Sequence, residues 1–156
     1  MISKQAANTI LNALCGKSQY ASLASNCYLG LSATEPETSD YTGGEIEPSG
    51  NGYARKFIGG YNTTASQYMA NAANGVITNA QEIHFDEATG SWNVMIEGVS
   101  SPLRYVCIYA SATGGHPLAW GKLGKTVGGE WQEEPVSPTA NTVVVIKAGD
   151  LRISLT

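Results

Sequence analysis

Apolar and polar positions follow a helical period at the start of the chain. Four apolar residues fall on one face there, at Ala7, Ile10, Leu11 and Leu14. Ser3 is a suitable N-cap and Gly16 a suitable residue after the last turn, so we expect a helix between them. The stripe is narrow, because the other positions include Lys4, Asn8 and Asn12. We therefore expect residues 1–17 to form a docking helix, with Ile10 and Leu14 as candidate contacts to a neighbour.

Beyond the helix the period changes to two, which is typical of half-buried strands. In residues 27–32 the alternation places on one face Cys27, Leu29 and Leu31. In residues 53–58 it places on one face Tyr53, Arg55 and Phe57. Both segments are therefore expected to be strands of a sheet with one apolar face.

Further short strands follow, separated by turn residues such as Gly114-Gly115 and Gly128-Gly129. Besides the two above, we expect strands near 76–78, 82–85, 93–99, 104–110, 118–123, 142–147 and 151–156. Strands that recur every ten residues or so are typical of sandwiches and small barrels. The predicted fold class is all-β, an antiparallel β-sandwich or jelly-roll-like domain, with one N-terminal α-helix. Residues 18–156 form a single β-sandwich domain in this prediction.

Composition excludes several classes of protein. Charged residues make up only 14% of the chain and the net charge is -4, which argues against a coiled coil and against duplex nucleic-acid binding. With 42% hydrophobic residues, the chain can bury a core and is not a disordered segment. The glycine- and proline-rich stretches 33–52 and 59–75 are expected to be loops.

The termini and the three cysteines indicate a protein assembled in a cytoplasm. The N-terminal apolar stretch is interrupted by polar residues and has Leu14 before Cys15, which does not fit a signal peptide. No apolar run is long enough for a membrane span, so we expect no membrane insertion. Cys15, Cys27 and Cys107 have long spacings, so we expect no zinc site and no disulfide framework. Cys107 lies in a strand-like run and is expected to be a buried free thiol.

Candidate catalytic groups are sparse, and we expect no enzyme, no cofactor and no metal. His84 shares a strand face with Glu82 and Asp86, which suggests at most a small hydrolase or a surface metal site. His116 lies in a glycine-rich turn. The sequence lacks a serine-nucleophile elbow and a complete phosphate-binding loop. The acidic stretch 35–47 is expected to be solvated, with cation binding as the alternative.

Aromatic residues supply the remaining candidate contacts. The chain has 3 Trp, 8 Tyr and 2 Phe, and Trp and Tyr suit half-buried surfaces, protein interfaces and sugar-stacking platforms. We expect Trp92 and Trp120 to lie in the core. The candidate interface or ligand-contact residues in or beside loops are Tyr41, Tyr61, Tyr68 and Trp131.

Five strings in one order resemble a known family. They are YLGLSATEP at 28–36, EPSGNGYAR at 47–55, FDEATGSW at 85–92, IYASATGGHPLAWG at 108–121 and AGDLRISL at 148–155. Together they resemble the small virion proteins of tailed bacteriophages commonly described as phage tail fibre proteins. The resemblance implies a non-enzymatic structural protein that is rich in β-structure and works in multiple copies. It carries over no catalytic residue.

The function expected is therefore a tail fibre or tail-associated module of the virion, assembled in the host cytoplasm. Its expected partners are other phage virion proteins and copies of itself. Two alternatives stay open at this point. One is a decoration or cement protein of the phage head. The other, from a different class, is a carbohydrate-binding module that recognises a host surface glycan through its exposed aromatic residues.

Overall fold

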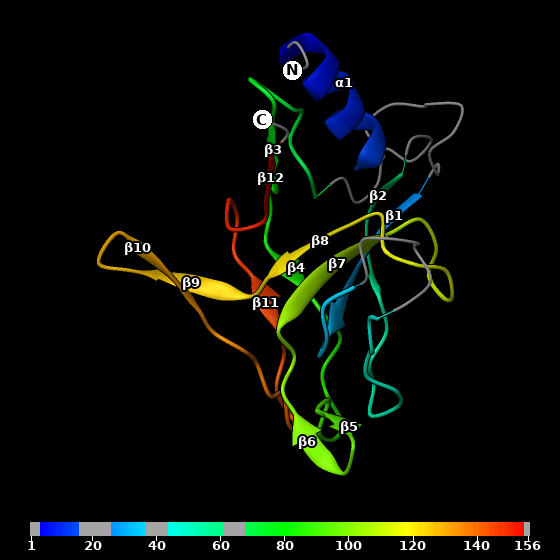
Figure 1. The fold of residues 1–156 in the computed structure, drawn as a ribbon. Helices are drawn as coiled ribbons and strands as arrows, with labels where there is room; N and C mark the ends of the chain where they lie inside the picture. Colours follow the sequence, from blue (N-terminus) through cyan, green and yellow to red (C-terminus); the bar gives the residue numbers. More distant parts are fainter. Residues whose placement is uncertain (1–3, 16–25, 37–43, 61–67, 155–156) are drawn as a thin grey trace.

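The computed structural model describes residues 4–15, 26–36, 44–60 and 68–154. It shows an all-β domain built from several antiparallel sheets, with one helix, α1 (Lys4–Leu14), near the N-terminus (Figure 1). The predicted fold class of an all-β protein with an N-terminal helix is confirmed. The jelly-roll-like arrangement and the domain division after residue 17 stay predictions.

The central sheet has four antiparallel strands in the order β2-β1-β7-β8. The strands are β1 (Asn26–Ser32), β2 (Lys56–Gly60), β7 (Tyr105–Tyr109) and β8 (Ala119–Lys122). Alternation in β1 buries Cys27, Leu29 and Leu31 as the sequence predicts. The register of β1 with β2 shifts between Cys27 and Tyr28, an irregularity that bends the strand locally.

In the part of the chain that the structure describes, eight further strands form four two-stranded sheets. β3 (Val76–Thr78) pairs with β12 (Arg152–Ser154), and β4 (Ile83–His84) pairs with β11 (Val145–Ile146). β5 (Val94–Ile96) pairs with β6 (Val99–Ser101), and β9 (Gly124–Val127) pairs with β10 (Glu130–Glu133). The last two pairs are hairpins that extend away from the centre of the molecule (Figure 1).

Both hairpins correct the sequence prediction. Residues 93–99 were expected to be one strand, but the chain reverses at Glu97 and Gly98, whose φ angles of 49° and 80° suit a two-residue hairpin turn. The turn at Gly128-Gly129 was expected, but not the strands that flank it. Those strands are polar and lack alternation, so their pattern carries no strand signal.

One apolar cluster joins the central sheet to the smaller ones. Its largest members include Leu29, Ile58, Met69, Ile77, Ile83, Phe85, Trp92 and Leu103. Trp92 is buried, as predicted, and its indole N–H donates to the Asn51 carbonyl oxygen at 2.8 Å. Trp120 is only half-buried, so its assignment to the core was wrong. The edge position of β8 explains this difference, because among the described residues one side of that strand has no neighbouring strand.

The buried side-chain amide of Asn79 holds the segment after β3 against the segment between β11 and β12. The side-chain nitrogen of Asn79 donates to the carbonyl oxygens of Gln81 and Lys147, both at 2.8 Å. Its side-chain oxygen accepts from the backbone N–H of Leu151 at 2.9 Å. Because Asn79 is buried, these three bonds satisfy polar groups that water cannot reach.

Helix α1 packs on the domain through a face that differs from the expected stripe. Leu11 is buried in the apolar cluster, whereas Ile10 is 41% exposed. Asn8 and Asn12, expected to lie off the packing face, accept hydrogen bonds from the backbone N–H groups of Gly75 and Ala72. The side chain of Ala7 and the expected caps Ser3 and Gly16 lie outside the described residues. No helix in the described ranges is long and apolar enough to cross a membrane.

Candidate functional site

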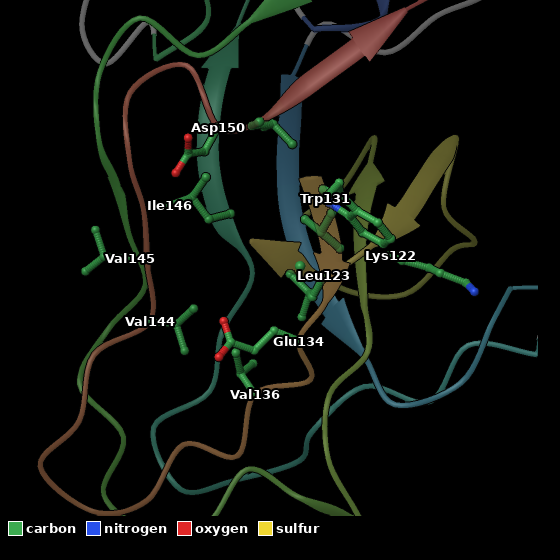
Figure 2. Close-up of a pocket in the computed structure, with 12 residues that line it drawn as sticks. Lys122, Leu123, Trp131, Glu134, Val136, Val144, Val145, Ile146 and Asp150 are labelled. Atoms are coloured by element: carbon green, nitrogen blue, oxygen red, sulfur yellow. The ribbon is translucent and has the colours of Figure 1, made fainter. Parts of the chain in front are cut away.

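A groove lies beside the β9–β10 hairpin. It encloses about 250 Å³ and is lined by apolar side chains that include Val144, Ile146 and Leu123. Figure 2 shows Val144 and Ile146 on one side of this cavity and Leu123 on the other. Glu134 and Asp150 also line it, so the groove combines apolar walls with carboxylates.

Trp131, on β10, is the aromatic residue of this groove. A Cβ atom added to Gly124 would lie only 2.6 Å from Cζ2 of the Trp131 indole. The indole therefore lies directly over the glycine, an arrangement that stabilises glycine in a strand. Trp131 is nevertheless 54% exposed, so much of its ring is available for contact with another molecule.

Charges of both signs surround the groove. Lys122 at the end of β8 pairs with Glu133 of β10, and Lys125 of β9 pairs with Glu134, which follows β10. All four side chains are about half exposed, so each pair adds little stability. A second hollow of about 640 Å³ adjoins the groove and shares Trp131 and Asp150 with it, and Lys125 and Lys147 also line this hollow. This mixture suits binding to a surface of mixed polarity.

A second polar site is the buried ion pair between Glu47 and Arg55. The guanidinium group of Arg55 donates to both carboxylate oxygens of Glu47, with Nε 3.0 Å from Oε1 and Nη2 2.5 Å from Oε2. Its Nη1 donates to the carbonyl oxygens of Ser111 and Gly114. Its Cζ lies 3.3 Å from the ring centroid of Tyr109. Arg55, whose side chain is 5% exposed, thus fixes two loops to the central sheet.

Tyr53 completes this cluster. Its hydroxyl donates to Glu47 Oε1 at 2.7 Å and accepts from the backbone N–H of Leu31 at 2.9 Å. Burial, followed by the charge of Glu47, raises the pKa of Tyr53 well above its usual range. Burial opposes the charge of Arg55, but the hydrogen bonds and charge of Glu47 outweigh it and raise the pKa of Arg55. These groups therefore hold fixed charge states, as expected of a structural site.

Gly30 provides the space for the cluster. A Cβ atom added there would lie 2.7 Å from Glu47 Oε1, 2.7 Å from Tyr109 Cε2 and 3.1 Å from the Tyr53 hydroxyl. Any larger residue in the middle of β1 would displace the ion pair, so glycine is required by packing at this position.

All three cysteines are buried free thiols, as the sequence predicts for Cys107. Burial raises the pKa of the Cys107 thiol to about 12. A hydrogen bond with Cys15, followed by burial, raises the pKa of Cys27. A thiol with a raised pKa is a poor nucleophile at neutral pH. No group of three or more His, Cys, Asp or Glu side chains within the described ranges could hold a metal ion.

A family described as podophage GP4 fiber I protein gp80 matches residues 1–151. The chain belongs to this family. The expected relationship to phage tail fibre proteins is thereby confirmed, and it extends over the N-terminal helix as well as the β domain. No curated protein matches the chain.

In this member of the fiber I family, the candidate contact residues lie in different places. Ile10 is exposed and Leu14 half-buried on α1, while Tyr68 is half-buried and packs against the apolar cluster. Trp131 lies at the groove. Tyr41 and Tyr61 lie outside the described residues. Thus the structure does not bring Ile10, Tyr68 and Trp131 together as one site.

The two histidines each have a carboxylate partner. His84 Nε2 lies 3.1 Å from Glu82 Oε2, with both side chains more than half exposed. His116 Nδ1 lies 2.9 Å from Glu45 Oε1. The acidic stretch 35–47 was expected to be solvated, but Glu45 and Glu47 are held by His116 and Arg55. Residues 37–43 of that stretch lie outside the described residues.

The sequence did not reveal the Glu47–Arg55 pair or the groove. The alternation over 53–58 placed Tyr53 and Arg55 on one face. It therefore indicated that these two residues of the ion-pair cluster lie close together. The partner Glu47 lies in a loop with no periodicity, so its position could not be inferred. The groove is formed by β9–β10 and by residues near β11. These segments are separated in the sequence and come together only in the folded chain.

Proposed function

We propose that this chain is a non-enzymatic structural module of a phage tail fibre, present in several copies in the virion. The observation that carries the proposal is the match to a fiber protein family over residues 1–151. The description of that family favours the fibre over decoration of the phage head. Assembly from newly made chains in the host cytoplasm follows, because phage particles are built there and the buried thiols need no oxidation.

The chemistry of the described residues supports a structural role. Tyr53, Arg55, Cys107 and Tyr109 have raised pKa values, and their side chains lie in buried or partly buried contacts. Catalytic groups instead need access to substrate and a pKa near the working pH. His84, the strongest catalytic candidate in the sequence, faces solvent beside a single carboxylate.

The partners proposed are other virion proteins and copies of the same chain. Apolar residues exposed on the two hairpins fit such contacts: Met95 and Val99 on β5–β6, and Val127 and Trp131 on β9–β10. Exposed apolar side chains on projecting hairpins are available to a neighbour without any rearrangement of the core.

Quantitative mass spectrometry of purified virions tests the proposal. We expect the chain to be present, at far fewer copies than the major capsid protein, and antibody labelling to lie on the tail. Copies that match the capsid lattice would support head decoration instead. Absence of the chain from purified particles would contradict a virion role altogether.

A further inference from the structure

Two of the cysteines meet inside the apolar cluster. Cys15 extends the last turn of α1, where its backbone N–H donates to the Leu11 carbonyl oxygen at 3.1 Å, and Cys27 lies near the start of β1. Their side chains are 0% and 1% exposed, and both belong to the apolar cluster. The two thiols are hydrogen-bonded to one another. Two sulfur atoms from different elements of the fold are therefore already in contact.

The third cysteine, Cys107, lies on the other face of the central sheet. In the register of β1 with β7, Cys107 is opposite Gly30. Successive residues of a strand point to opposite faces, so Cys107 shares the face of Gly30, whereas Cys27 shares the face of Leu29. The Cys107 thiol is hydrogen-bonded to Tyr109. The fold therefore brings together one particular pair of the 3 cysteines in the chain.

Helix α1 depends on its contacts with the β domain. It has 11 residues, and an isolated helix of this length is marginal in water. Its anchors include the buried Leu11 and the side-chain oxygens of Asn8 and Asn12, which accept from backbone N–H groups. A covalent bond from Cys15 to Cys27 would add an anchor at the C-terminal end of the helix. It would also restrict the chain whenever α1 leaves the domain, which favours the docked helix.

The redox environment of a virion protein changes when the particle leaves the host. Thiols stay reduced in a cytoplasm, whereas disulfides form and persist outside the cell. A chain assembled in the host cytoplasm keeps both thiols, as the structure has them. After release, the same pair meets oxidising conditions.

We propose that Cys15 and Cys27 form a disulfide after the virion leaves the host, and that this bond locks α1 onto the central sheet. The timing rests on the proposed function of a virion module, whereas the choice of this pair rests only on the contact between the two thiols.

The oxidant is a low-molecular-weight disulfide. The thiolate of one cysteine attacks a sulfur atom of this molecule, the S–S bond of the oxidant breaks, and a first small thiol leaves. The other cysteine then attacks the mixed disulfide, forms the Cys15–Cys27 bond and releases a second small thiol. The two cysteine thiols are oxidised, and the oxidant is reduced to two thiols that take up both protons.

Burial controls how this reaction begins. The hydrogen bond with Cys15, followed by burial, raises the pKa of Cys27, and only a thiolate attacks a disulfide. The first attack therefore takes place when the end of α1 opens locally and water reaches the pair. The return of the helix then brings the two sulfur atoms together, so the fold directs the second attack to the neighbouring cysteine.

Thiol mapping of the purified full chain tests the pairing. The chain is incubated with oxidised glutathione, quenched with acid, alkylated in denaturant and digested with trypsin. Trypsin cleaves between Cys15 and Cys27 at Lys17, so the disulfide joins two separate peptides. We expect these peptides to be joined and Cys107 to be alkylated. Cys107→Ala is the matched control and should form the same bond, whereas a chain oxidised in urea should give a mixture of all cysteine pairs.

Hydrogen exchange tests the lock. Amide exchange within α1 should slow by about tenfold or more in the oxidised chain relative to the reduced chain. Cys27→Ala cannot form the bond, so its α1 should exchange at the same rate before and after incubation with the oxidant. Circular dichroism should show this variant folded.

Three results on the purified chain would overturn the inference. They are a wild-type chain that keeps all its thiols in oxidised glutathione, a disulfide that includes Cys107 as often as the other two cysteines, and α1 exchange that the bond does not slow.

The timing is tested on infected cells and particles. Chain alkylated at lysis should carry both thiols, and chain from purified virions should carry the disulfide; thiols in both would contradict the timing. Absence of the chain from particles would contradict the proposed function and the timing together, whereas the pairing is decided on the purified chain.

Discussion

Removal of the Arg55 guanidinium is expected to destabilise the domain strongly. In Arg55→Met, the Glu47 carboxylate loses its bidentate partner while its side chain is only 20% exposed. Breaking a buried pair by removing one charge costs about 3–5 kcal/mol, because the remaining charge is left without compensation. With a urea dependence of about 2 kcal/mol per molar, the unfolding midpoint should fall by about 2 M.

The double variant separates charge from packing. In Arg55→Met combined with Glu47→Gln, no buried charge is left unpaired, so the loss should be smaller than the sum of the single losses by about 2 kcal/mol. Arg55→Lys keeps the charge but loses the bidentate geometry and the contact with the Tyr109 ring. Its stability should therefore lie between those of the wild type and Arg55→Met.

The matched control is the exposed pair of His84 with Glu82, whose side chains are both more than half exposed. His84→Gln should change stability by less than about 1 kcal/mol. All variants are compared by urea unfolding at one protein concentration, because self-association would shift the apparent stability. A loss below about 1 kcal/mol in Arg55→Met, or single losses that simply add in the double variant, would refute the reasoning.

Three further predictions concern other buried groups. Gly30→Ala should cost about 1–3 kcal/mol through overpacking, whereas Gly121→Ala in the same sheet, with no atom within 4 Å of the added Cβ, should be near neutral in urea unfolding. Asn79→Ala should cost about 3 kcal/mol, because three backbone groups lose their partner, and the exposed Asn71→Ala should cost almost nothing. Burial raises the pKa of Cys107 from 9.0 to about 12, so the folded chain keeps a proton that the unfolded chain loses. Stability is then full below about pH 9 and falls above it by about 1.4 kcal/mol per pH unit. Between pH 8 and pH 10, in reductant, Cys107→Ala should lose less stability than the wild type, and equal losses would contradict the assignment.

Local patterns in the sequence predicted local structure well. The helical spacing and end signals placed a helix that the structure describes as Lys4–Leu14. The alternation of Cys27, Leu29 and Leu31 identified the strand and its buried face together. These predictions succeed because burial of one face imposes a period on the residues of a single element.

The sequence failed where an element has no buried face of its own. Strands β9 and β10 are exposed along their whole length. Neither strand buries a face, so their sequences show no regular alternation of apolar and polar residues. The Gly128-Gly129 turn between them was visible, because the φ angles of 60° and 89° at these glycines depend only on the turn itself. A hairpin whose strands are exposed on the chain leaves a turn signal without a strand signal.

The acidic loop shows a different reason for failure. Its glutamates have no basic residue within 35–47, and a run of unpaired acids is ordinarily solvated. Their partners come from other parts of the chain: Arg55 approaches Glu47, and His116, distant in sequence, approaches Glu45. Charge pairing depends on the fold and not on spacing, so a chain with few charges can place them almost entirely in specific contacts. In this protein Glu45 and Glu47 fix loops through such contacts, and the Arg55 double-mutant cycle measures the contribution of Glu47 directly.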